Sequence, residues 1–206
     1  MAKKKAGVKP GEKKLGTKDR IIQAASRLME DKGYSATVMA EILVQSSSPK
    51  GSVYYHFPGG KEEIGAAAVL AGAASLAQTI RDELGGGTEL PTRFLAFVDS
   101  LATALEAGDL GTGGPLTIVA AETASASRLL NDACQKGFDQ VRDAFLDVLT
   151  ESGFSGEEAL ALGLSLCAGL TGAITLARTY HRADYLRQVG KTFLSILAGP
   201  SGRLAV

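Results

Sequence analysis

Apolar side chains recur at every third or fourth position along most of the chain, and this spacing predicts α-helices. In the first helix Ile21, Ala25 and Leu28 share one face, while Thr17 is placed to cap its start and Gly33 to end it. The alternation of apolar and polar residues that marks a β-strand does not compete with these segments. The pattern therefore predicts an all-α protein.

The same periodicity divides the chain into a small N-terminal module and a larger C-terminal one. A second short helix follows Thr37 and a third falls within residues 49–56, before the Pro-Gly-Gly break at 58–60. We therefore predict a three-helix domain over residues 17–60 and a bundle of about six helices over residues 61–200. The helices of the bundle are expected near residues 61–84, 91–105, 116–132, 134–152, 156–182 and 184–198.

Charge separates these modules although the whole chain is neutral. The 22 Lys and Arg balance the 22 Asp and Glu, but residues 1–61 hold 12 basic and 5 acidic side chains and the remainder 10 and 17. Residues 1–16, rich in Lys and Gly with little apolar content, are expected to form a disordered basic arm. A basic module joined to an acidic one is typical when only the small module meets nucleic-acid phosphate.

Enzymatic and metal-dependent chemistry finds little support in the sequence. The run at residues 59–61 superficially resembles a phosphate-binding loop, but Tyr55 and Glu62 stand where such a loop needs Gly and Ser or Thr. His56 and His181 lie far apart in the sequence, and neither has a C-x-x-C or H-E-x-x-H partner that would indicate a metal site. The G-x-S-x-G motif of a nucleophile elbow is also absent. We therefore predict no enzyme, no cofactor and no metal.

One stretch supports a different function, a membrane-associated helical protein. Residues 159–177 form 19 consecutive residues without a charge, which is long enough for a membrane span. Three glycines, Ser165 and the acidic residues just before the run argue against insertion, and a buried core helix has the same composition. The basic N-terminus lacks the apolar run of a signal peptide, and Cys134 and Cys167 form no disulfide framework, so a cytoplasmic protein is expected.

The motif that carries function lies in residues 17–64. A first helix ends in Lys32-Gly33-Tyr34, and residues 50–63 then read KGSVYYHFPGGKEE. This ordered set, about a quarter of the chain, resembles the DNA-reading domain of the TetR family of bacterial repressors. Its YYHFPGGKEE part looks like the subgroup related to the lincomycin and multidrug-resistance repressors. The resemblance implies a homodimer that binds palindromic operator DNA through a helix-turn-helix and releases it when a small molecule binds the C-terminal domain.

The resemblance also implies which residues meet the DNA. The first residues of a recognition helix read base edges in the major groove, while flanking groups bind phosphates. Lys50 stands at that leading edge, Gly51 removes a Cβ where the backbone approaches DNA, and Ser52 has a hydroxyl for a base or phosphate. For Lys50 the alternative is an ordinary solvated lysine. For Tyr54 and Tyr55 the alternative is that their rings pack against the first helix. The residues expected on phosphate are Thr37, Tyr54, Tyr55, His56 and Lys61.

Two residues depart from the family pattern in the turn before the recognition helix. Ser47 stands where the family usually has glycine, and Ser48 where it usually has an apolar residue. A serine in the left-handed conformation costs about 1 kcal/mol relative to glycine. Pro49 partly compensates because its fixed φ favours the first turn of a helix.

A ligand site is expected among helices of the C-terminal domain, with access through the Gly-rich segment 108–115. Glu122 stands out because an ionised carboxylate in Ala-rich apolar sequence is either solvated or awaits a partner from the ligand. For any one of the apolar residues, ordinary burial in the core is the alternative. The predicted ligand-binding set is Phe94, Phe97, Ile118, Glu122, Phe138, Phe145 and Cys167.

A homodimer interface is expected on the last two helices, since the uncharged run must bury its surface somewhere. Small residues at positions 169, 172 and 173 would allow close approach of backbones. The alternative is burial of the run inside one subunit. The residues predicted to supply apolar contact across the dimer are Leu166, Leu170, Ile174, Phe193 and Leu197.

Overall fold

The computed structural model describes residues 15–86, 89–108, 114–123 and 126–198. Most of the predicted arm over residues 1–16 and most of the segment 108–115 therefore lie outside the described residues. Within the described ranges all regular structure is helical, which confirms the all-α class. The helices are α1 (Thr17–Lys32), α2 (Met39–Gln45), α3 (Lys50–His56), α4 (Lys61–Leu84), α5 (Leu90–Glu106), α6 (Leu116–Thr123), α7 (Arg128–Glu151), α8 (Gly156–Tyr180) and α9 (Asp184–Leu197).

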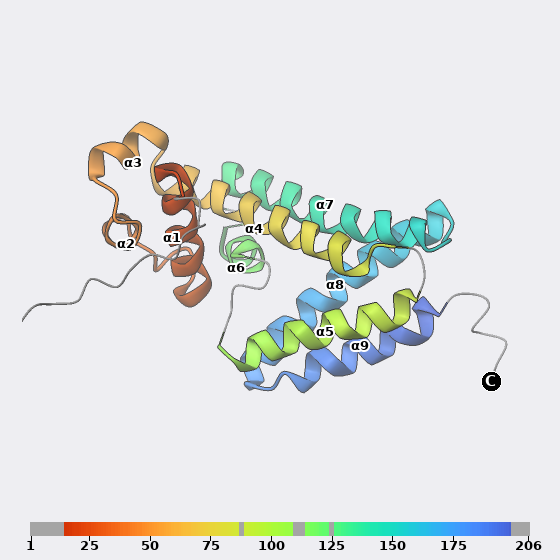
Figure 1. The fold of residues 1–206 in the computed structure, drawn as a ribbon. Helices are drawn as coiled ribbons and strands as arrows, with labels where there is room; N and C mark the ends of the chain where they lie inside the picture. Colours follow the sequence, from red (N-terminus) through yellow and green to blue (C-terminus); the bar gives the residue numbers. More distant parts are fainter. Residues whose placement is uncertain (1–14, 87–88, 109–113, 124–125, 199–206) are drawn as a thin grey trace, which may run out of the picture.

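Helices α1 to α3 form a compact module at one end of the molecule (Figure 1). Ile21 and Met29 from α1, Ile42 from α2 and Val53 from α3 are all fully buried, so each helix contributes its apolar face to one small core. Gly33 follows α1 with φ of +87°, a conformation that favours glycine, and turns the chain toward α2. We call α1–α3 the reading module below.

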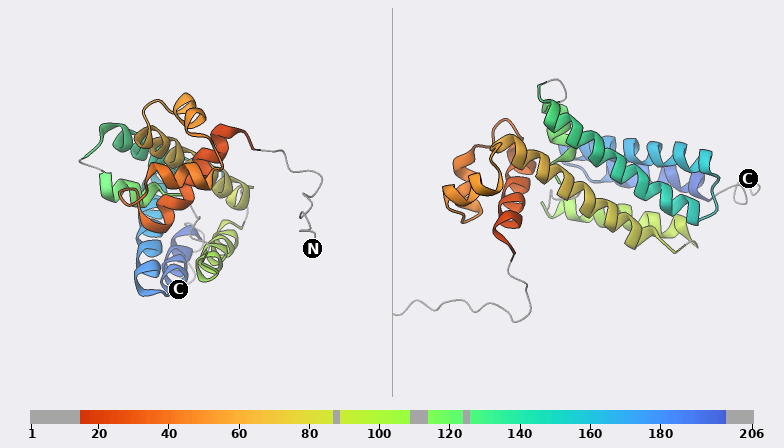
Figure 2. Two further views of the ribbon diagram at one scale, coloured as in Figure 1. Left: turned by 90° about the vertical axis from the view of Figure 1, so that its left-hand side faces the viewer. Right: turned by 90° about the horizontal axis from the view of Figure 1, so that it is seen from above.

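Helices α4 to α9 form the larger domain, which we call the regulatory domain. Helix α4 packs along α7, α8 packs against both α7 and α9, and α5 packs against α9. The short α6 contacts α1, α4 and α7, so it lies where the two domains meet. Seen from above, the long helices extend away from the reading module, with α4 leading out of it (Figure 2).

The predicted helix boundaries were wrong in two places. Thr17 is the first residue of α1 rather than its N-cap, a position that Gly16 occupies without a side-chain hydrogen bond. The helix predicted over residues 116–132 ends as α6 at Thr123, and α7 begins at Arg128. The break has a local cause, because the Ser127 hydroxyl accepts a hydrogen bond from the Leu130 amide at 3.2 Å and so caps α7.

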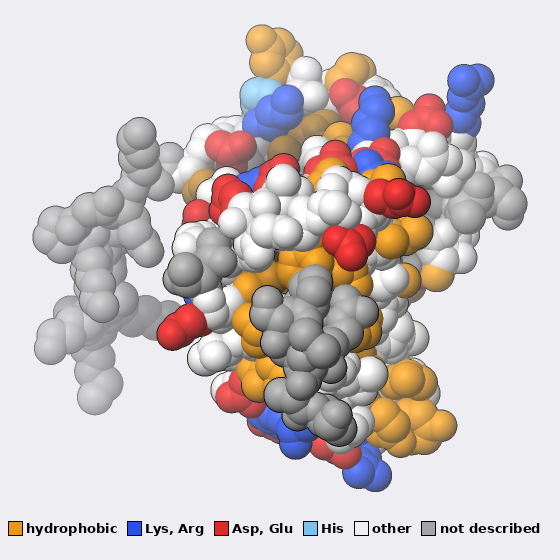
Figure 3. Space-filling model, turned by 90° about the vertical axis from the view of Figure 1, so that its right-hand side faces the viewer, with side chains coloured by type: hydrophobic (Ala, Val, Ile, Leu, Met, Phe, Trp, Pro, Cys, Tyr) orange, Lys and Arg blue, Asp and Glu red, His pale blue; other side chains and the backbone are white. Residues whose placement is uncertain are grey.

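Two helices, α4 and α8, are long and apolar enough to cross a membrane by length and composition. Each also packs against other helices of the domain, as the core helices of soluble proteins do. At the end of the molecule opposite the reading module, acidic and basic side chains are interspersed around a hydrophobic area (Figure 3).

Candidate DNA interface and regulatory cavity

Helix α3 divides its residues cleanly between core and surface. Val53 is buried against α1, whereas Lys50, Gly51, Tyr54 and Tyr55 are exposed. Tyr55 is 82% exposed, which is unusual for so large a ring in a monomeric domain. A basic and aromatic surface without an internal packing role is suited to contact with another molecule.

The exposed side chains of α3 also support one another. The Lys50 ammonium lies 5.9 Å from the centre of the Tyr54 ring, and the Tyr55 and His56 rings meet edge to face at 5.2 Å. Gly51 has open space around its Cα, since no atom lies within 4 Å of the position that a Cβ would take. The predicted base-reading residues Lys50, Gly51 and Ser52 therefore lie together in the first turn of the helix.

The turn before α3 contains the strain that the sequence predicts. Ser47 has φ of +51°, so a serine occupies the left-handed conformation that glycine usually takes. Ser48 is buried, and its hydroxyl donates to the Ser46 carbonyl at 3.2 Å, which satisfies the polar group where an apolar one was expected. Arg20 donates to the same carbonyl at 3.3 Å and ties α1 to the turn.

Two residues predicted to bind phosphate are engaged inside the protein. Thr37 is fully buried and its hydroxyl donates to the Gly33 carbonyl at 2.8 Å, so it offers DNA no side-chain surface in this structure. The Lys61 ammonium donates to the Thr37 carbonyl at 2.8 Å and lies 4.3 Å from the centre of the Tyr34 ring. The pKa of Lys61 is lowered, because burial lowers it more than the nearby Glu122 charge raises it.

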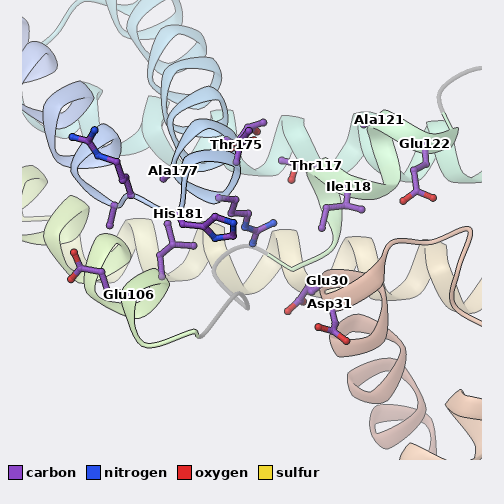
Figure 4. A pocket seen from close by; sticks show the side chains of 15 residues that line it. Glu30, Asp31, Glu106, Thr117, Ile118, Ala121, Glu122, Thr175, Ala177 and His181 are labelled. Atoms are coloured by element: carbon purple, nitrogen blue, oxygen red, sulfur yellow. The ribbon is translucent and has the colours of Figure 1, made fainter.

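Beside α6, a cavity of about 830 Å³ lies between the two domains, and we call it the larger cavity. Figure 4 shows its lining: the end of α1 supplies Glu30 and Asp31, α6 supplies Ile118 and Glu122, and the ends of α5 and α8 complete the wall. A smaller cavity of about 40 Å³ lies deeper in the regulatory domain. Its lining includes Leu76, Leu116, Phe138, Val141, Cys167 and Ile174.

The structure does not bring the predicted ligand-binding residues together in one cavity. Ile118 and Glu122 line the larger cavity, whereas Phe138 and Cys167 line the smaller one. The remaining three, Phe94, Phe97 and Phe145, are fully buried and line neither cavity. Phe94 shows the reason, because its ring meets Phe193 edge to face at 6.2 Å and so joins α5 to α9.

Glu122 has a partner that the sequence did not reveal. Its carboxylate accepts hydrogen bonds from the backbone amides of Tyr34 at 3.2 Å and Ser35 at 2.7 Å, both in the reading module. Partial burial raises the pKa of Glu122, but the bonds from Ser35 and Tyr34 and the charge of Lys61 outweigh it and lower the pKa. Glu122 is therefore an ionised carboxylate held at the domain boundary.

The sequence matches two family models and several known regulators. A model described as bacterial regulatory proteins of the tetR family matches residues 21–68, and one described as the C-terminal domain of LmrA/YxaF-like transcriptional regulators matches residues 92–192. The uncharacterised regulator YxaF of Bacillus subtilis is 32% identical over 163 residues, which cover 79% of this chain and 85% of that protein. The chain belongs to the TetR family of bacterial transcriptional regulators.

Further relatives agree with this TetR-family assignment. The transcriptional regulator LmrA of Bacillus subtilis is 29% identical over 181 residues, covering 88% of this chain and 96% of that protein. The reduced form of Escherichia coli NemR has the same fold, with a TM-score of 0.73 over 85% of this chain and 95% of that one, at 22% identity. The assignment confirms the predicted family and fold, and these regulators are not enzymes.

The family assignment also decides between the two functions considered from the sequence. The chain is a TetR-family transcriptional regulator of the DNA-binding repressor class, rather than a membrane-associated helical protein. Its uncharged run at residues 159–177 forms most of α8, one side of which is buried against the subunit's own core.

The residues predicted to form the dimer contact pack against the core of the single subunit. Leu166, Leu170 and Leu197 are buried within the single subunit, because their sides of α8 and α9 face the core. Ile174 and Phe193 are partly buried against that same core, and Phe193 lies so close to Gly169 that a Cβ there would collide with its ring. The opposite side of α8 exposes small and apolar residues, which are Leu160, Leu164, Ala168, Gly172 and Leu176.

Proposed function

We propose that this chain represses transcription as a homodimer bound to palindromic operator DNA, and that a small lipophilic ligand in the regulatory domain releases it. The observation that carries the proposal is the exposed basic and aromatic surface of α3, set in a reading module of the TetR family. Such an exposed helix fits the major groove of B-DNA. The protein acts in the cytoplasm, where its operator lies.

Within this proposal the first turn of α3 reads bases and the rest of the helix grips phosphate. Lys50 and Ser52 reach base edges, with Gly51 allowing close approach, while Tyr54 and Tyr55 contact the backbone. His56 adds a phosphate contact, and Lys61, whose ammonium donates to the Thr37 carbonyl, adds its charge to the positive N-terminus of α4. Thr37 is left out of the contact set because it is buried.

Selection of binding sites from random duplex DNA tests the proposal. We expect enrichment of a symmetric motif whose half-sites lie about one helical turn or more apart, with affinity that falls steeply as salt increases. For the Lys50→Ala variant described in the Discussion, the control for a general loss of positive charge is Lys136→Ala, which removes an exposed lysine of α7. If the wild-type protein enriches no symmetric motif, the repressor function is refuted.

The exposed side of α8 is the proposed dimer interface. Leu160, Leu164 and Leu176 are each about half exposed or more, and Ala168 and Gly172 between them would let a partner helix approach closely. A contiguous apolar stripe of this kind on a soluble protein marks an interaction surface. The opposing α8 of a second copy is apolar in the same places, as a two-fold axis requires.

The position of the cavities beside α6 supports the proposed release by a ligand. The smaller cavity is lined mainly by apolar side chains, and the larger one reaches residues of α1 in the reading module. A ligand releases DNA only if it prefers the conformation in which the two recognition helices no longer match adjacent major grooves. A thermal-shift screen of lipophilic compounds, followed by titration of stabilising compounds into the operator complex, tests this step. Compounds that stabilise the protein without weakening operator binding would count against it.

A further inference from the structure

Helix α6 reaches out of the regulatory domain and holds the turn that follows α1. The Glu122 carboxylate, one residue before the end of α6, accepts the Ser35 amide at 2.7 Å and the Tyr34 amide at 3.2 Å. Hydrogen bonds to an ionised acceptor are stronger than neutral ones. Gly33 makes the approach possible, because a Cβ at this position would collide with the Glu122 carboxylate.

The other side of the same turn is held by α4. The Lys61 ammonium lies over the Tyr34 ring and donates to the Thr37 carbonyl. Gly65 lies directly under the ring, since a Cβ there would stand 3.0 Å from Tyr34 Cε2. The turn thus lies between a carboxylate from α6 and an ammonium from α4, and its position depends on both helices.

Glu122 also belongs to the wall of the larger cavity, together with Ile118 and Ala121 of the same helix (Figure 4). A molecule that enters this cavity and displaces α6 must therefore move the Glu122 carboxylate relative to the turn. Coupling between two sites requires an element whose position both sites influence, and α6 satisfies this condition through one named contact.

We propose that Glu122 is a positioning residue that fixes the reading module for operator binding, and that its two amide contacts are what a ligand in the larger cavity must break. The inference rests on the proposed function for its DNA measurement. Without the contacts, the module is free to take more orientations, and a dimer must then fix two of them at once on adjacent major grooves. Operator affinity falls as a result.

The test compares Glu122→Ala and Glu122→Gln with Glu83→Gln, which changes an exposed glutamate of α4 away from the turn. Amide hydrogen exchange of the full-length protein, followed by NMR, reports on the contact itself. We expect exchange at Ser35 and Tyr34 to accelerate by about tenfold or more in Glu122→Ala, less in Glu122→Gln, and not in the control. Core amides of α4 and α7 should exchange as in the wild type, which excludes general destabilisation.

Binding to the selected operator provides the second measurement. Glu122→Ala should weaken operator binding about tenfold while changing binding to a scrambled duplex by less than about twofold, because only the operator demands a fixed register of two modules. Unchanged exchange at Ser35, or operator affinity within about twofold of the wild type despite faster exchange, overturns the proposal. Failure of the wild-type protein to select symmetric DNA refutes the proposed function instead, and amide exchange still decides whether Glu122 holds the turn.

Discussion

One helix of the reading module exposes two aromatic rings, whereas three phenylalanines of the regulatory domain lie in its core. In the reading module Tyr54 and Tyr55 point outward from a helix of seven residues, over a small core. In the regulatory domain Phe94, Phe97 and Phe145 are all buried. Burial therefore indicates the role of an aromatic side chain better than its residue type does. A buried ring stabilises the fold, whereas an exposed ring is available to a partner.

Helix α8 contains both situations within a single element. Leu170 is 6% exposed and Leu164 is 61% exposed, although both lie in the same uncharged run. The comparison predicts that the same substitution at these two positions has different consequences.

The largest effect is expected for Leu170→Arg. An arginine there would place an unpaired charge in the hydrophobic core, which costs about 4 kcal/mol or more. Urea denaturation should show a folded state that is lost or severely destabilised. A variant with wild-type stability that is merely monomeric would show that Leu170 faces a partner subunit after all.

Leu164→Arg should instead dissociate the dimer while leaving each subunit folded. Its side chain is exposed on the proposed interface, so the new charge is costly only when a second subunit covers it. Light scattering at micromolar concentration should show a monomer with a helical circular-dichroism spectrum. Leu129→Arg, at another exposed leucine near the start of α7, is the control and should remain dimeric. A dimeric Leu164→Arg protein would refute this interface.

Substitutions on α3 should separate base reading from phosphate binding. Lys50→Ala should cost about 1–3 kcal/mol on the preferred operator and relax its sequence preference, since a base contact is lost. His56→Ala should weaken operator and scrambled duplexes alike. Fluorescence anisotropy on both duplexes, measured at several salt concentrations, distinguishes the two patterns. Equal losses on both duplexes for Lys50→Ala would assign it to phosphate.

Ser47→Gly should stabilise the protein by about 1 kcal/mol, because glycine adopts the positive φ of this turn without the steric cost that serine bears. Part of the gain is offset by the greater freedom of glycine in the unfolded chain. Chemical denaturation of the variant and the wild type measures the difference in the free energy of unfolding. A loss of stability would show that the Ser47 side chain makes a compensating contact.

The smallest effect concerns the pH dependence of the Glu122 contact. The pKa of Glu122 is lowered in the folded protein, so its ionised form stabilises the fold above the unfolded value of about 4.3. This contribution is lost as the pH falls through the lowered folded value. The stability difference between wild type and Glu122→Gln should be below about 1 kcal/mol at neutral pH, since the group is partly solvated, and should vanish in acid. A stability difference that persists in acid would show that packing, rather than the charge of Glu122, causes it.

The sequence predicted the reading module more fully than the regulatory domain, for physical reasons. Gly33 and the Pro-Gly-Gly break at 58–60 end helices by local conformational rules, so α1 to α4 follow from nearby residues. In α8 the run has no charged residue to mark which side faces water, and the predicted dimer residues Leu166 and Leu170 are buried in the subunit's own core. The N-cap Ser127 was a local signal that the predicted helix over 116–132 overlooked.

The contact of Glu122 could not be predicted from local sequence at all. Its partner Tyr34 is 88 positions away, and only the packing of α6 against α1 brings the two together. The larger cavity has the same origin, because Glu30 and Asp31 of α1 join residues from the ends of α5 and α8. Local patterns specify elements, whereas a site at a domain boundary depends on how those elements pack.

Comparison of a full operator with its half-site tests the central claim most directly. A dimer whose two recognition helices bind adjacent major grooves should bind the selected palindrome at least about a hundredfold more tightly than a duplex carrying one half-site and a scrambled second half. The account predicts that Leu164→Arg abolishes this advantage while leaving half-site affinity unchanged. Equal affinity of the wild-type protein for the palindrome, the half-site and a scrambled duplex would contradict it.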